Sequence, residues 1–260
     1  MNKTKLILKY GLLDFLAAMC AWGFFFVYRK CFVNGDFNPY YLQFVWNDSK
    51  LYLGMLSIPL FWIGLYSLIG LYRNVYRKSR LTEFFQILTV SITGVLILFF
   101  VLILDDEVSQ YRSFYTSISV LFLLHFLPTS ILRIALSSII ANKIKNRVIG
   151  FRTLLIGAGP KALQIYQELS SAKKSEGHFF QGFVNVNGEK GAVSGIPKLG
   201  SKKDIESIIK QHQIDEVIIA TEEYQKGDIA SIVSLLDGES VVIKIIPDMY
   251  QHLAGMVKMG

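Results

Sequence analysis

The sequence predicts a bundle of four membrane-spanning helices followed by a cytoplasmic α/β domain with a mostly parallel sheet. Two observations lead to this fold class. The 260 residues are 52% hydrophobic with a mean hydropathy of +0.40, and the apolar residues crowd into the first half of the chain. The second half alternates short apolar runs with amphipathic stretches, as α/β proteins do. The predicted domains are residues 1–147 and 148–260.

Four segments are long and apolar enough to be spans, because crossing a bilayer takes ~20 mostly apolar residues. Arg29 and Lys30 follow the first segment, where a cleaved signal peptide would have a small-residue pattern, so this segment is interpreted as an anchor. The predicted spans are Gly11–Tyr28, Leu51–Leu71, Ile87–Leu104 and Phe114–Leu132.

The basic residues around the spans predict their direction. Twelve lie on one side and four on the other, and the richer side is cytoplasmic by the positive-inside rule. Both chain ends are therefore expected in the cytoplasm. The net charge is +7, and many of the Lys and Arg residues flank the apolar spans. This distribution predicts a lipid bilayer as the partner and no nucleic acid. The twelve are Lys3, Lys5, Lys9, Arg73, Arg77, Lys78, Arg80, Arg133, Lys143, Lys145, Arg147 and Arg152; the four are Arg29, Lys30, Lys50 and Arg112.

Polar residues within the spans invite functional hypotheses, Asp14 by default, but we favour a structural role for each. Asp14 is an ionisable group inside the first span, and we expect it to pair with Arg73 or Arg133. His125 is interpreted as a neutral packing residue and not as a proton relay, because the sequence places no carboxylate partner at its depth in the membrane. The two cysteines, at positions 20 and 31, are expected to be free thiols.

The α/β domain is expected to alternate strand and helix with right-handed crossovers. A helix begins in the stretch "GAGPKALQIYQELSSA", another has Ser201 as its N-cap and Asp204 in its first turn, and a third covers Ile229–Leu236. The expected strands are Arg152–Ile156, Phe179–Val186, Asp215–Thr221 and Val241–Pro247.

The glycine-rich turn after the first of these strands is the candidate ligand site. Gly157, Gly159 and Ala162 have G-x-G-x-x-A spacing, which lets a pyrophosphate approach a helix N-terminus. A dinucleotide site also takes an acidic residue ~20 positions later, and here the second strand ends in asparagine. Pro160 also removes one backbone N–H. Two interpretations stay open: a tight turn without a ligand, or a site for a nucleotide or another anionic ligand.

Other chemistry is not indicated by the sequence. No catalytic residue and no metal ligand are predicted, because the motifs for nucleophilic, Walker-type and zinc chemistry are missing. Glu222 and Glu223 follow a strand at the edge where parallel sheets bind ligands, but we favour a solvated loop as the explanation for them. Between the second and third spans the predicted loop offers only Glu83 as a carboxylate.

The order of several stretches resembles a known family. "GLYRNVYRKSRLTEF", "TLLIGAG", "QGFVNV", "GIPKLGSKKDI", "IDEVIIA" and "VVIKIIPDMYQHLAGMVKM" follow one another as in the amino-terminal half of the bacterial polyprenyl-phosphate sugar-phosphate transferases. Those enzymes start exopolysaccharide, capsule or O-antigen synthesis. The resemblance implies a Rossmann-like or CoA-binding-like module, a location in the bacterial inner membrane, and an anchoring and regulatory role.

In that family a carboxy-terminal domain with an Asp-Glu pair and magnesium moves a sugar phosphate from a nucleotide sugar to polyprenyl phosphate. This chain has no residues that match that domain, so we expect it to be inactive alone. Magnesium, nucleotide sugar and polyprenyl phosphate are expected only through such a domain. Two alternatives stay open: the first half of a membrane-bound nucleotide-sugar dehydratase or epimerase, and a stand-alone nucleotide-sensing scaffold. A homo-oligomer is compatible with each.

Overall fold

A computed structural model of the chain describes residues 3–33, 36–73, 75–76, 78–103, 111–186, 191–221 and 228–245. The chain forms two compact units, Met1–Ala141 and Asn142–Gly260, which we call the helical unit and the α/β unit.

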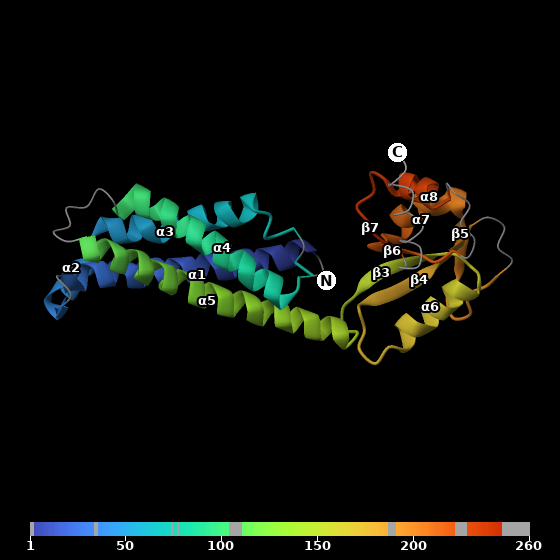
Figure 1. Cartoon of the computed structure of the whole chain (residues 1–260), viewed down its shortest axis with the longest axis horizontal. Helices are drawn as coiled ribbons and strands as arrows, with labels where there is room; N and C mark the ends of the chain where they lie inside the picture. The colour runs from blue at the N-terminus through green and yellow to red at the C-terminus, as the bar shows by residue number, and fades with distance from the viewer. Residues whose placement is uncertain are drawn as a thin grey trace. The chain divides into compact units, whose positions relative to one another are not determined.

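The helical unit contains the four apolar helices that the sequence predicts (Figure 1). Each is long and apolar enough to cross a membrane. The second helix ends earlier than predicted because Gly70 adopts φ +79° and the Leu71 N–H bonds back to the Tyr66 carbonyl, which closes the helix. The helices are α1 (Lys3–Cys31), α3 (Ser49–Leu68), α4 (Arg80–Leu98), which a π-helical turn continues (η2, Phe99–Ile103), and α5 (Tyr111–Lys145).

Of the predicted loop residues that lie inside helices instead, two are fully buried. Arg133 belongs to α5, because this helix continues past the predicted end of the fourth span to Lys145. The Arg133 side chain is fully buried. Glu83 lies in the first turn of α4, whose N-cap Ser79 accepts a hydrogen bond from the Thr82 N–H. Arg133 is therefore a buried helix residue and not one of the loop charges on which the predicted asymmetry rests.

Aromatic stacking organises the centre of the helical unit. The His125 ring lies 3.6 Å from the Trp62 ring at an interplanar angle of 12°, and His125 Nε2 is 2.8 Å from the Tyr66 hydroxyl. This arrangement agrees with the packing role predicted for His125. Gly94 of α4 lies flat against Trp62, since an added Cβ would be 2.3 Å from the indole.

A short folded segment joins α1 to α3 and was not predicted. Its pieces are the antiparallel pair β1 (Phe32–Val33) and β2 (Asp36–Phe37), a 3₁₀ turn η1 (Pro39–Tyr41) and the short helix α2 (Leu42–Val45).

The α/β unit is built on a five-stranded parallel sheet of Rossmann-like order, β5-β4-β3-β6-β7. The four predicted strands are all present, and β5 is an additional edge strand of only four residues. The elements are β3 (Phe151–Ile156), α6 (Pro160–Ser171), β4 (His178–Asn185), β5 (Lys198–Ser201), η3 (Lys202–Asp204), α7 (Ile205–His212), β6 (Glu216–Ile219), α8 (Asp228–Leu236) and β7 (Val242–Ile245).

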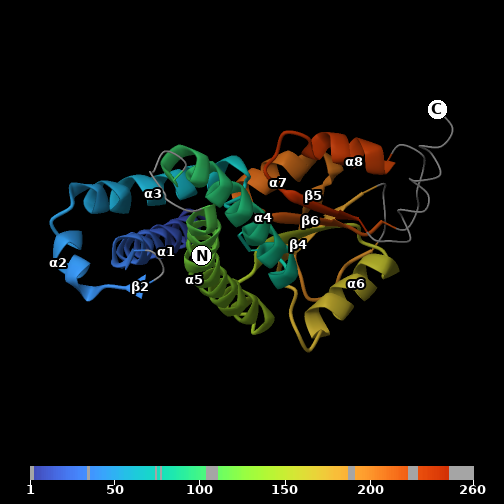
Figure 2. The same cartoon turned by 60° about the vertical axis from the view of Figure 1, so that its left-hand side comes forward.

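Helices cover both faces of this sheet, with α6 on one face and α7 and α8 on the other (Figures 1 and 2). Alternate residues of β3 serve the two cores, because successive side chains of a strand point to opposite faces. Leu155 packs in the α6 core and Leu154 in the α7–α8 core. Ser201 and Asp204 form the predicted helix cap as a reciprocal capping box.

Candidate functional site

The predicted ligand turn lies at the middle of the carboxyl edge of the sheet. The chain leaves β3 toward β4 and leaves β6 toward β7, in opposite directions, so the crevice between β3 and β6 is the topological switch point. Open α/β sheets bind their ligands at this place. Gly157 adopts φ +128°, and an added Cβ would be 2.3 Å from the Ala220 carbonyl oxygen. Only glycine lets the turn approach the end of β6 this closely.

The structure brings the three predicted residues into one strand-to-helix turn. Gly159 is the N-cap of α6, with φ −83° and ψ −177°, and Pro160 takes the first helical position, where no N–H is needed. Ala162 is fully buried against the sheet. The first turn of a helix offers unpaired N–H groups and the positive end of the dipole, so this turn suits an anion.

Two features leave fewer backbone N–H groups for a ligand at this turn than a standard dinucleotide-binding turn offers. The Gly157 N–H donates to the Val184 carbonyl at 2.9 Å, so this amide belongs to the sheet. Gly191 packs on the turn, since its added Cβ would be 1.8 Å from the Ala158 oxygen and 3.4 Å from the Gly159 nitrogen. The backbone N–H groups that could still meet a phosphate are therefore those at the start of α6.

The end of β4 provides an amide where dinucleotide sites place a carboxylate. Asn185 is the last residue of this strand, and the sequence continues with Val186 and a second asparagine. An asparagine lacks the charge with which an acidic residue binds a ribose diol. Glu222 and Glu223, the predicted alternative at this edge, lie outside the described residues.

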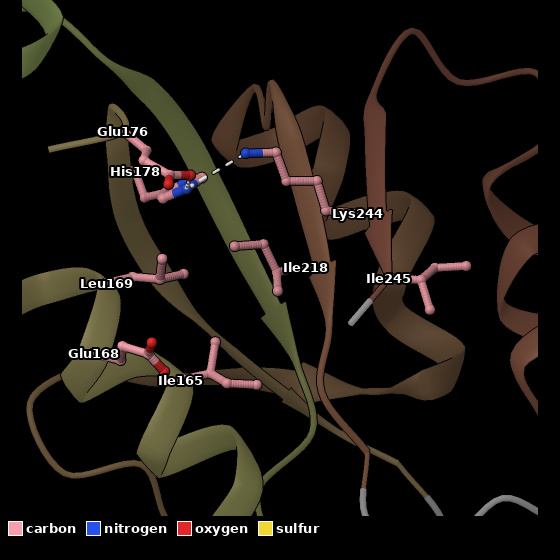
Figure 3. A pocket seen from close by; sticks show the side chains of 8 residues that line it. All are labelled: Ile165, Glu168, Leu169, Glu176, His178, Ile218, Lys244 and Ile245. Carbon is pink, nitrogen blue, oxygen red and sulfur yellow. Dashed lines mark hydrogen bonds and ion pairs between the residues drawn. The ribbon is translucent and has the colours of Figure 1, made fainter. Parts of the chain in front are cut away.

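A polar cluster that sequence reasoning missed lies on the α6 face of the sheet, where strands begin (Figure 3). The buried Glu216 carboxylate accepts hydrogen bonds from His178 Nδ1 and from the Thr153 hydroxyl, the latter at 3.3 Å. Lys244 Nζ is 3.3 Å from the other Glu216 oxygen and 3.4 Å from His178 Nε2. The glutamate, which is the first residue of β6, thus bonds the first residue of β4, the middle of β3 and the middle of β7.

A pocket of about 230 Å³ opens beside this cluster. Apolar side chains of α6, β6 and β7 form much of its wall, and Glu168 and Glu176 add negative charge (Figure 3). Because the groups of the cluster are paired with one another, we assign them a structural role in joining the four strands β3, β4, β6 and β7. The lining residues are Ile165, Glu168, Leu169, Glu176, His178, Ile218, Lys244 and Ile245.

A second buried charge cluster lies in the helical unit and confirms one prediction. Arg133 Nη1 is 2.8 Å from Asp14 Oδ2, so Arg133 is the partner of Asp14. Arg133 Nε is 3.5 Å from Glu83 Oε1, and all three side chains are 1% exposed or less. The guanidinium also lies 5.1–5.5 Å from the ring centres of Tyr10, Tyr66 and Tyr72, within cation–π range.

The turn after α3 contributes to this charge cluster from outside the candidate spans. The Tyr72 hydroxyl donates to Asp14 Oδ2 at 2.7 Å. Burial, and then the neighbouring Asp14, raise the pKa of Tyr72 above its usual value, so the phenol stays a donor. Lys78 Nζ donates to the Leu71 carbonyl at 2.5 Å, and burial lowers the pKa of this ammonium.

Metal chemistry has no support in the described ranges, where no group of three or more His, Cys, Asp or Glu side chains could hold a metal ion. The two cysteines, Cys20 and Cys31, are free thiols, as predicted.

Comparison with known families identifies the chain. Residues 67–247, which make up more than half of the sequence, match the family described as "CoA-binding domain". The chain belongs to this family. The CoA-binding domain match includes α4 and α5 as well as the five strands, so Glu83 and Arg133 lie inside the matched region and Asp14 lies before it.

No curated protein matches the chain. Two similar solved structures are "Crystal structure of RSP in complex with beta-NADH" and "Crystal structure of RSP, a Rex-family repressor". Each is 14% identical to this CoA-binding domain protein, and the similarity covers 68% of this chain and 92% of the other. The TM-scores are 0.32 and 0.33, which is too low to inform on the ligand of this chain.

Proposed function

We propose that this chain is a membrane-anchored module that binds the phosphates of a nucleotide at the Gly157–Ala162 turn. In this proposal it is the anchoring and regulatory half of a sugar-phosphate transferase that starts polysaccharide synthesis on polyprenyl phosphate, in the bacterial inner membrane. The observation that carries the ligand proposal is the glycine turn at the switch point, with the start of α6 beside it. The transferase role rests on the sequence resemblance and on the four apolar helices.

The residues around the turn favour one class of nucleotide. An acidic residue at the end of β4 would bind a free ribose diol but repel a ribose that carries a phosphate. The sequence has Asn185 and Asn187 at this place, so a nucleotide with a phosphorylated ribose is not opposed. Coenzyme A has this chemistry, because its adenosine ribose carries a 3′-phosphate, and the family description agrees with it.

Gly159 offers a sharp test, because its backbone angles are open to every residue. Both Gly159→Asp and Gly159→Asn introduce a side chain that can cap α6, so both variants should fold. They are isosteric and differ only in charge. The aspartate is expected to repel a bound phosphate, whereas the asparagine is not.

Calorimetric titration of the purified full chain in nanodiscs tests these expectations. Wild type should bind coenzyme A more tightly than dephospho-coenzyme A or NADH, Gly159→Asn should retain binding, and Gly159→Asp should lose it. Equal binding by the two variants, or no binding of coenzyme A by wild type, would contradict the proposed site.

The transferase role is tested separately in the cell. Gly159→Asp in the chromosomal gene is expected to change the amount of surface polysaccharide while leaving the amount of protein in the membrane unchanged. Polysaccharide at the level of the Gly159→Asn strain would contradict a regulatory role for this ligand.

A further inference from the structure

The segment between α1 and α3, together with the first turn of α3, presents a group of aromatic side chains to its surroundings. We call this group the α2 aromatic cluster. Its side chains are 37–63% exposed, and residues 37–47 contain no charged side chain. The members of the cluster are Tyr40, Tyr41, Phe44, Trp46 and Tyr52.

This segment is folded firmly against the helices, so its aromatic side chains are held outward. Val45 is fully buried in a small core with Phe26 and Leu51. The Asn38 N–H donates to the Cys31 carbonyl at 2.8 Å, and the Asn38 side chain accepts from the Tyr40 N–H at 3.0 Å.

The other end of the segment is fixed in the same way. The Tyr52 hydroxyl donates to the Trp46 carbonyl at 3.0 Å, which ties α3 to the end of α2. Lys30 Nζ forms an ion pair at 2.8 Å with Oδ2 of Asp48, the N-cap of α3. The exposed rings are therefore a property of the fold.

The chemistry of the α2 aromatic cluster fits a bilayer interface better than water or hydrocarbon. Exposed aromatic patches are unusual on soluble surfaces. Tyrosine and tryptophan have an apolar ring and a polar tip, and they gather where acyl chains meet headgroups. The adjoining helices α1 and α3 also expose apolar side chains, including Phe24, Leu53 and Leu56.

We propose that the α2 aromatic cluster lies in the headgroup region of a lipid bilayer and sets the depth of the helical unit. This inference rests on the membrane anchoring proposed above. With a rise of 1.5 Å per residue, the ~30 Å hydrocarbon core takes ~20 residues of helix. Counting back from Cys31 at the end of α1 reaches the neighbourhood of Gly11. Asp14, and with it Arg133, then lies just inside the opposite boundary.

Fluorescence quenching by brominated lipids tests this placement in phosphatidylcholine vesicles that contain the full chain. The protein has three tryptophans, so the Trp46 signal is the difference between wild type and Trp46→Phe. Trp46 emission should be blue-shifted from that of tryptophan in water and quenched more by bromine near the headgroup than by bromine near the acyl-chain end. Water-like emission with quenching by aqueous iodide alone, or strongest quenching by deep bromine, would overturn the proposal.

The Trp46→Phe protein separates this inference from the anchoring on which it rests. Its remaining partly exposed tryptophan, Trp22 in α1, should be quenched more by deep bromine, whereas Trp62 is fully buried among the helices and serves as an unquenched background. If Trp22 does not respond to either lipid, the membrane anchoring itself fails. If Trp22 responds as expected and Trp46 does not, only the interfacial placement fails.

The depth-setting role has its own matched pair of variants. In the Trp46→Phe background, Phe44→Lys replaces an exposed ring with a charge, whereas Phe44→Tyr keeps an interfacial ring. Only the lysine variant should shift the ratio of shallow to deep quenching of Trp22. An unchanged ratio in the lysine variant would contradict the depth-setting role.

Discussion

Replacing Arg133 with methionine should be the most damaging single change in the charge cluster of the helical unit. Arg133 bonds two buried carboxylates, Asp14 at 2.8 Å and Glu83 at 3.5 Å. At an effective dielectric constant of about 20, unit charges at these distances attract by roughly 6 and 5 kcal/mol. Most of this attraction is offset by desolvation. Removing one partner of a buried pair still costs about 3–5 kcal/mol, because the other charge stays buried without compensation.

The stoichiometry of the cluster predicts an order for the single variants. Arg133→Met leaves two uncompensated carboxylates, whereas Asp14→Asn leaves the longer pair and Glu83→Gln leaves the shorter one. The loss of stability should therefore fall from Arg133→Met to Asp14→Asn to Glu83→Gln. The triple variant, which has no charge among these three residues, should be more stable than Arg133→Met alone.

Unfolding in mixed detergent micelles, followed by far-ultraviolet circular dichroism, measures these differences. The reasoning would be refuted if Arg133→Met lay within about 0.5 kcal/mol of wild type, the usual range for unimportant surface positions. Strict additivity of the single effects in the triple variant would also refute it, because residues in one ionic network should couple.

Three further outcomes are expected. Gly94→Ala should cost about 1–3 kcal/mol by overpacking against Trp62. At Gly64 an added Cβ would meet no atom within 4 Å beyond the backbone of its own helix, so Gly64→Ala should gain up to about 1 kcal/mol of helix propensity in the same micelle assay. Hydrogen bonds from Ser201 lower the pKa of Asp204, so the stability they give is present above the ordinary value of 3.8 and is lost as the pH falls below it. Ser201→Ala should therefore reduce the acid sensitivity of unfolding, and an acid response equal to that of wild type would contradict this. A reporter fused to the carboxyl end of the chain should read cytoplasmic and one inserted between α4 and α5 should read extracytoplasmic, and the reverse pattern would contradict the proposed topology.

Local sequence patterns predicted those parts of the fold that depend on local physics. Apolar length revealed the four helices, and glycine spacing revealed the turn at Gly157 because a strand, a tight turn and a helix start follow one another along the chain. Asp14 was assigned to one of two arginines because a buried carboxylate needs a cation. The choice of Arg133 needed the structure, since apolar length alone did not show that α5 continues beyond its predicted span.

Features that depend on contacts between distant segments escaped prediction. The edge strand β5 contains Lys198, Gly200 and Ser201 in four residues and has no apolar alternation to reveal it. His178 and Glu216 are 38 residues apart, and their contact follows only from the parallel register that aligns the starts of β4, β3 and β6. A parallel sheet brings its strand starts to one edge, so polar residues at these starts are a signal worth reading in similar sequences.

The central place of β3 has a consequence for the order of events during synthesis. Thr153 of β3 is aligned with Glu216 of β6, 63 residues later, so one edge of β3 has no partner until the ribosome has released β6. Contacts of such sequence separation form slowly, because a long loop must close before the pairing is gained. The hairpin-like pair of α1 and α3 joins segments that are much nearer in the chain. The nascent chain should thus acquire its helices well before its sheet, and the open edge of β3 is the surface that a chaperone or an unwanted second strand would meet in the interval.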